Sequence, residues 1–392
     1  MQLDPIHEDG MRETLARFWD DFKQIALFAL GQNVGPLTPT LEQLLRIWEV
    51  LRIEEHVRYA RSLEGRPPKD RLAIARAFVA KSFLNLPTTT ALLDRLQVDH
   101  ALRRLCGFER PKDVPSESTF SRAFAEFATT DLGQRTHESL VKQLYGEGIV
   151  GHVSRDATAI EARERPRKAE QGPADPPAIP RKRGRPKKGE AKPEPKMTRL
   201  EKQSQPGVSL QTMLEDLPKQ CDVGTKKNSH GYKVTWQGYK LHLDVCDTGM
   251  PLSAILTSAS VHDSQVAIPL MKMTGARTGT IFYELMDSAY DAPLIEAASR
   301  DAGRVPIIDV NPRQNAEKQE SKRQRPVREK LQLPLAQDVR FNERTTVERA
   351  NARLKDEFGA DSLRVRGHAK AMCHLMFGVC VLAADTLLRL VV

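Results

Sequence analysis

The chain has 392 residues, a hydrophobic fraction of 40%, 25 prolines and a formal net charge of +9. This length is enough for two domains, and the basic balance suits a polyanionic partner such as nucleic acid. The five cysteines are scattered and form no Cys-x-x-Cys pair, so they give no sign of zinc or redox chemistry. No signal-peptide pattern is present, and charged residues interrupt the apolar stretch 374–392. We therefore expect a cytoplasmic protein with no membrane partner.

Residues 1–147 are predicted to form an all-helical N-terminal domain that binds DNA or mediates dimerisation. From Met11 to about Tyr145 the pattern is helical, and no strand-like alternation occurs. Clusters of glycine and proline divide this region into several helices. One of these helices is expected to span Leu92 to Cys106.

A second predicted helix follows the Ser116–Thr119 cluster, whose hydroxyls can cap its first turn. Phe120, Phe124 and Phe127 recur on it at i, i+4 and i+7, and Arg122 lies on another face. Two interpretations fit this pattern. Either the phenylalanines pack in a core, which is the commoner case, or the helix belongs to a helix-turn-helix whose Arg122 contacts DNA.

Most of the net charge lies in one segment, because residues 163–202 hold 14 Lys and Arg against 6 Asp and Glu. The surrounding stretch, about 164–205, has almost no large apolar residue and is expected to be a disordered basic insertion. A run within it resembles the AT-hook motif, whose arginines enter the narrow minor groove of A·T-rich DNA. The alternative is a solvated tether that adheres to DNA without sequence preference. The central residues of the run are Arg183, Gly184, Arg185 and Pro186.

Residues 148–392 are predicted to form an α/β catalytic domain, because short β-rich runs alternate with helical segments from Gly148 onward. A second polar, basic segment, about 311–339, is expected to be a long loop. The order of the elements favours a mixed sheet covered by helices. The predicted strands are Ile149–Ser154, Gly238–Val245, Leu252–Thr257, Thr280–Met286 and Val305–Ile308. The predicted helices are Ser264–Thr274, Pro293–Arg300, Arg344–Phe358 and Ala369–Leu390.

Three acidic residues of this domain are candidates for catalysis and metal binding. Asp156 is expected to end the first strand, Asp287 follows an apolar strand, and Glu348 lies on a later helix. Two divalent ions about 3.5 to 4 Å apart can activate water and neutralise phosphate charge, and Mg²⁺ prefers carboxylate oxygens. Taken singly, an aspartate at a strand end is a common turn former. His262 and Asp263 can lie near this site, although a structural turn is the simpler interpretation. The neighbouring acids that remain as alternatives are Asp291, Glu343, Asp356 and Glu357.

The helix that carries Glu348 has a regular pattern of charge. Arg344, Glu348 and Lys355 occur at i, i+4 and i+11, which places a carboxylate between two cations on one face. In an arbitrary protein such a face is most often solvated and holds a weak ion pair. An apolar stripe on the next face predicts that the helix packs on a core. The stripe consists of Val347, Ala350, Leu354 and Phe358.

This spacing resembles the Tyr-Arg-Glu-Lys signature of DDE insertion-sequence transposases, in which two residues, three residues and six residues separate the four positions. Phe341 stands where that signature has tyrosine. Other segments from about Leu92 onward are similar to the same family. They are Leu102–Phe108 and Val114–Arg122 for its N-terminal domain, Gly231–Asp244 and Pro251–Asp263 for its central strands, and Arg364–His368 after its catalytic helix.

The resemblance implies an RNase H-like core and a transposase that cuts DNA at terminal inverted repeats and joins the 3′ ends to target DNA. It implies that Asp156, Asp287 and Glu348 form the catalytic triad and hold two Mg²⁺ or Mn²⁺ ions. It also implies that Arg344 and Lys355 contact the DNA backbone. Two DNA ends must be brought together, so we expect a homodimer. The alternatives are an RNase H-like nuclease or resolvase without strand transfer, and a domesticated, noncatalytic DNA-binding protein.

Overall fold

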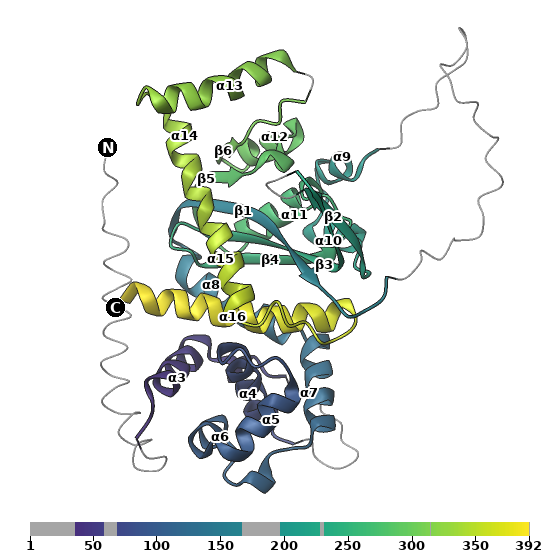
Figure 1. Ribbon diagram of the computed structural model, residues 1–392, viewed down its shortest axis with the longest axis vertical. Coiled ribbons are helices and arrows are strands. Elements are labelled where there is room, and N and C mark those ends of the chain that lie inside the picture. Colours follow the sequence, from purple (N-terminus) through teal and green to yellow (C-terminus); the bar gives the residue numbers. More distant parts are fainter. Residues whose placement is uncertain (1–35, 59–68, 167–196, 228–230, 314, 392) are drawn as a thin grey trace, which may run out of the picture.

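The computed structural model of the protein describes residues 36–58, 69–166, 197–227, 231–313 and 315–391. Within these residues, a helical N-terminal region precedes a mixed sheet with helices packed around it (Figure 1). This order agrees with the fold class predicted from the sequence. The helices of the N-terminal region are α3 Pro39–Leu51, α4 Arg71–Phe83, α5 Thr89–Val98, α6 His100–Cys106, α7 Glu117–Thr129 and α8 Leu132–Tyr145.

The predicted single helix Leu92–Cys106 is two helices in the structure, α5 and α6. Asp99 separates them, because its extended backbone ends α5. Its carboxylate then accepts a 2.9 Å hydrogen bond from the backbone N–H of Leu102 and caps α6. Helical periodicity continues across this junction, which is why the sequence pattern did not reveal the break.

The three phenylalanines of α7 pack in the core. Phe120 and Phe124 lie 5.7 and 5.0 Å from the ring of Phe78 on α4, measured between ring centroids. Phe124 also lies 6.3 Å from Phe377 in the C-terminal helix. The packing interpretation of this face is therefore correct. Arg122 is exposed on the outer side of the same helix.

The sheet has the strand order β2-β3-β1-β5-β6, and β4 pairs with β3. β1 runs antiparallel to β3 and parallel to β5, so the sheet is mixed. The long strand β3 pairs with β2 through its first half and with β4 through its second half. The strands are β1 Ile149–Glu161, β2 Asp222–Lys227, β3 Lys233–Cys246, β4 Pro251–Ser258, β5 Thr280–Met286 and β6 Val305–Ile308.

Gly238 lies where β3 changes partner from β2 to β4. Its φ of 151° is unfavourable for residues with a side chain, and an added Cβ would lie 2.2 Å from the carbonyl oxygen of Ile160 on β1. Glycine is therefore required here if β1 and β3 are to pair closely along their full length.

Helices cover both faces of the sheet. Arg155 of β1 bonds to Asp244, which accepts a bond from Thr274 of helix α11 (Ser264–Gly275). The next residue, Asp156, accepts a bond from helix α15 (Thr345–Asp356). Successive side chains of a strand point to opposite faces, so α11 and α15 lie on opposite sides. The remaining helices of this region are α9 Arg199–Gln203, α10 Leu210–Asp216, α11 Ser264–Gly275, α12 Pro293–Asp301, α13 Ala316–Lys330, α14 Ala336–Phe341, α15 Thr345–Asp356 and α16 His368–Val391.

The C-terminal helix α16 joins the two regions of the molecule. It runs between the N-terminal helices and the sheet (Figure 1), and it contacts α3, α4, α7 and α8 as well as β4 and α15. One hydrophobic cluster extends from α3 through the strands to α16. α16 is long and apolar enough to cross a membrane, but its most apolar 18-residue window is wholly buried inside the protein. The predicted helix Ala369–Leu390 is thus a core helix.

Short helices occupy parts of the two segments that were expected to lack structure. At the end of the predicted insertion, Thr198 and Glu201 cap α9 reciprocally. In the predicted loop 311–339, the structure contains α13 and α14 instead. No side chain of α13 is buried, and Asn315 caps its first turn by accepting a bond from the N–H of Lys318. A helix without an apolar stripe gives no periodic signal in the sequence, which explains why this prediction was wrong.

Candidate active site

The pairing of β1 with β5 brings two of the predicted acids together. In this parallel pair Arg155 is opposite Met286, the last residue of β5, so Asp287 follows at the level of Asp156. The sequence correctly placed Asp287 directly after its strand. The expectation that Asp156 ends β1 was wrong, because the strand continues to Glu161 by pairing with β3.

Both aspartates are in an environment that disfavours their charge. Burial, together with the charge of Asp287, raises the pKa of Asp156 to about 6, although the backbone N–H of Ala157 and the Arg344 guanidinium act to lower it. Burial likewise raises the pKa of Asp287, although its carboxylate accepts a 2.9 Å bond from the N–H of Ala289. Two neighbouring carboxylates with raised pKa values form a site that favours a cation.

The third predicted acid lies on α15, which crosses the face of β1 and β3. The apolar stripe of this helix is buried as predicted, and Val347 and Leu354 are fully inaccessible to solvent. Glu348 is half exposed and accepts a 2.5 Å bond from Arg344. One turn further along, Asn351 donates a 3.2 Å bond from Nδ2 to Oδ2 of Asp156. The helix that carries Glu348 is thus bonded directly to the strand that carries Asp156.

Arg344 lies between these acids. Its guanidinium pairs with Glu348 and lowers the pKa of both Asp156 and Asp287 by its charge. It also lies 5.5 Å from the ring centroid of Phe341, and Arg325 of α13 lies 5.1 Å from the same ring. Phe341 therefore orients two guanidinium groups by cation–π contact, a role that needs no hydroxyl.

Lys355 lies at the other end of α15. It follows Glu348 by seven positions, which is about 10 Å along a helix. Burial lowers the pKa of this ammonium group, and the charge of Lys226 on β2 lowers it further, against Asp361 and Glu161. The structure thus brings Lys355 close to a second cation, away from the three acids.

Asp263 forms an acidic cluster with Asp156 and Asp287, although the sequence favoured a turn for it. It precedes α11 without capping that helix, and it pairs with Lys240 of β3 at 2.9 Å. Its charge raises the pKa of both Asp156 and Asp287. The neighbouring His262 does form a turn, with Nδ1 2.8 Å from the hydroxyl of Ser264.

A buried ionic network supports β1 below the site. Arg155 is 1% exposed and makes two 2.8 Å bonds to Asp244 and one of 3.3 Å to Glu284. Arg304 donates a 2.8 Å bond to the same glutamate, and Thr274 one of 2.6 Å to Asp244. This network was not predicted from the sequence. The signal was a charged residue inside each of three apolar strands, since such residues are almost never fully buried without a partner.

The donors present fit a divalent cation only in part. Among the residues that the structure describes, no three His, Cys, Asp or Glu side chains are gathered closely enough to hold a metal ion. Asp156 and Asp287 supply hard oxygen donors, as Mg²⁺ and Mn²⁺ require. The Oδ1 atom of Asn351 is buried beside them without a hydrogen-bond partner. Glu348 fits only after its carboxylate leaves Arg344.

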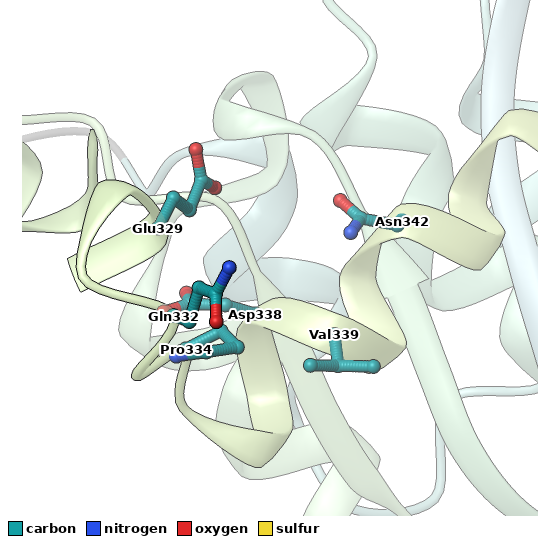
Figure 2. Close-up of a pocket in the computed structure, with 6 residues that line it drawn as sticks. All are labelled: Glu329, Gln332, Pro334, Asp338, Val339 and Asn342. Carbon is teal, nitrogen blue, oxygen red and sulfur yellow. The ribbon is translucent and has the colours of Figure 1, made fainter. Parts of the chain in front are cut away.

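A separate pocket of about 410 Å³ lies beside α14 (Figure 2). None of the three predicted acids lines it, so it is not the site described above. Its lining residues are Glu329, Gln332, Pro334, Asp338, Val339 and Asn342.

Two of the four acids that were alternatives to the predicted three are engaged elsewhere. Asp291 pairs with Lys318 at 2.6 Å and accepts a bond from the N–H of Asn311. Glu357 accepts three bonds from Arg353. The AT-hook-like residues lie outside the described part of the chain. They are Arg183, Gly184, Arg185 and Pro186.

Comparison with known proteins identifies two transposase segments in the chain. A model of the transposase DDE domain matches residues 198–383, and a model of a transposase domain, DUF772, matches residues 34–126. No curated protein and no solved structure matches the chain. The DDE match includes Asp287 and Glu348, whereas Asp156 precedes it. Both matches are to transposase domains, one on the mixed sheet and one on the helical region. The chain therefore belongs to the DDE transposases of insertion sequences.

Proposed function

We propose that this transposase cuts DNA at the terminal inverted repeats of its own element and joins the freed 3′ ends to target DNA. Asp156, Asp287 and Glu348 are the catalytic residues of this proposal. The observation that supports it most strongly is the register of β1 and β5, which sets Asp287 beside Asp156, with α15 bonded to the same carboxylate.

The two aspartates and Glu348 would hold two Mg²⁺ or Mn²⁺ ions, which when bound supply an activated water and neutralise phosphate charge. Asp156 and Asp287 are already fixed for this role by the sheet and by the N–H of Ala289. Glu348 is held by Arg344 in the absence of DNA. A DNA phosphate competes with a carboxylate for a guanidinium, so binding of DNA at Arg344 releases Glu348 toward the aspartates.

DNA contacts in this proposal extend beyond the acids. Arg344 and Lys355 bind the backbone at opposite ends of α15, and the exposed Arg122 of α7 provides a further cation. The AT-hook-like run adds minor-groove contacts. Two copies of the chain bring two DNA ends together as a homodimer, and the enzyme works in the bacterial cytoplasm, associated with the nucleoid.

The test is a cleavage and strand-transfer assay on DNA that carries the inverted repeats flanking the gene. The full chain is incubated with this DNA, target plasmid and Mg²⁺. Asp287→Asn and Glu348→Gln should each reduce cleavage by at least about a thousandfold, because removal of one group from a catalytic unit disables the whole unit. Substituted protein is first shown to be folded by circular dichroism.

Glu343→Gln is the matched control for Glu348, since Glu343 lies one turn earlier and acts on His152 instead of the aspartates. It should cut DNA at the wild-type rate. Undiminished cleavage by Asp287→Asn would overturn the catalytic assignment. Cleavage without joining to the target would favour a nuclease or resolvase, and wild-type protein that binds the DNA without cutting it would favour a noncatalytic protein.

A further inference from the structure

Asn351 has two amide atoms in contrasting situations. Nδ2 donates to the carboxylate of Asp156 at 3.2 Å, whereas Oδ1 has no hydrogen-bond partner among the described residues. The side chain is 6% exposed. A buried acceptor left unpaired costs about 1 to 3 kcal/mol, and native proteins retain few such atoms. The oxygen therefore calls for an explanation beyond packing.

The position of Asn351 in the fold indicates the role of this oxygen. Asn351 lies three residues after Glu348, on the side of α15 that faces the sheet. The bond to Asp156 fixes the side-chain amide of Asn351. Oδ1 belongs to this amide and is therefore held beside the acidic cluster. This cluster has no lysine or arginine bonded to Asp156 or Asp287 among the ion pairs within the described residues. A neutral oxygen at this place adds an acceptor without adding charge repulsion.

We propose that Asn351 is a positioning residue for the divalent cation of the proposed active site, on which this inference depends. Nδ2 fixes the orientation of the Asp156 carboxylate, and Oδ1 accepts a hydrogen bond from a water of the hydrated cation. Residues that orient a metal ligand in this way typically contribute about 10- to 100-fold to metal affinity.

The experiment measures Mn²⁺ binding to the full chain by electron paramagnetic resonance, with no DNA present. Asn351→Ala should weaken Mn²⁺ binding about 10-fold or more. Asn351→Gln, which retains both amide atoms, should stay closer to the wild type than to Asn351→Ala. Unfolding by urea is followed in parallel, so that affinity is compared only between folded proteins.

Asn85→Gly is the matched control. The Asn85 amide also donates to α15, at the carbonyl of Asp356 at its far end, and its φ of 49° is one that glycine adopts without strain. This variant should lose stability without any change in Mn²⁺ affinity. A merely structural role of Asn351 would make Asn351→Ala behave in the same way.

Two results separate this inference from the proposed function. If Asp156→Ala abolishes Mn²⁺ binding and Asn351→Ala leaves it unchanged, the role of Asn351 is overturned and the active site stands. If the wild-type protein and Asp156→Ala bind Mn²⁺ equally, the metal site itself is overturned. Equal losses in Asn351→Ala and Asn351→Gln would contradict the role of the amide.

Discussion

The two helices α15 and α13 are held in the molecule in opposite ways. α15 is fixed by an apolar stripe that includes Val347 and Leu354, and by the bond from Asn351 to β1. α13 buries no side chain and is held by exposed ion pairs such as Lys322 with Asp309. Apolar burial fixes an element firmly, whereas exposed ion pairs contribute little. The helix that carries a predicted catalytic residue is therefore the one built into the core.

Disruption of the buried network beneath the site should have the largest effect on stability. Arg155→Ala leaves Asp244 and Glu284 buried with one cation fewer, so we expect the free energy of unfolding to fall by about 3 to 5 kcal/mol. Urea unfolding at pH 7 measures this change. The exposed Arg122→Ala should change stability by less than about 0.5 kcal/mol. A small effect at Arg155 would mean that the network does not support β1.

Removal of the charge of Asp156 should have an intermediate effect on stability, and this effect should depend on pH. Its folded-state pKa, about 6, lies above the ordinary 3.8, so the protonated form is favoured by folding. Stability linked to this group is therefore present below pH 3.8 and is lost as the pH rises to about 6. In metal-free buffer, Asp156→Asn should stabilise the protein at pH 8 by up to about 3 kcal/mol and lose this advantage near pH 4.

Asp301→Asn serves as the control for this prediction, because Asp301 is an exposed acid at the end of α12. Its effect on stability should be small at both pH values. An Asp156→Asn variant that is destabilised at pH 8 would contradict the description of the site as a crowded acidic cluster.

Removal of an ion pair of α13 should have the smallest effect on global stability. Lys322→Ala removes a contact with Asp309 in which the lysine is 50% and the aspartate 28% exposed, so global stability should fall by less than about 1 kcal/mol. Hydrogen exchange of the amides of 316–330 should instead become up to about fivefold faster, because local opening of the helix needs less energy. A large drop in global stability would show that α13 belongs to the core.

The sequence predicted those parts of the fold that depend on local patterns. The strand Thr280–Met286 and its terminating Asp287 follow from an apolar run and an acid, and the burial of Val347 follows from helical spacing. The extension of β1 beyond Asp156 was missed, because it depends on pairing with β3. Asn351 was missed for a related reason: a polar residue on a helix gives no sign of which strand it will meet.

The charged residues show the same division. Arg344 beside Glu348 was predicted from a spacing of four residues. The network of Arg155 with Asp244 and Glu284 joins three strands that are far apart in the chain, and no local pattern reports such a contact. Long-range pairing of buried charges is decided by the topology of the sheet.

The most direct test of the proposed active site is a crystal structure of the protein with Mn²⁺ and a DNA end. Anomalous diffraction would locate the metal without assumptions about its ligands. The proposal predicts a manganese peak between the carboxylates of Asp156 and Asp287, with Glu348 turned away from Arg344 toward it. A peak elsewhere, or Glu348 still paired with Arg344 in the DNA complex, would contradict it.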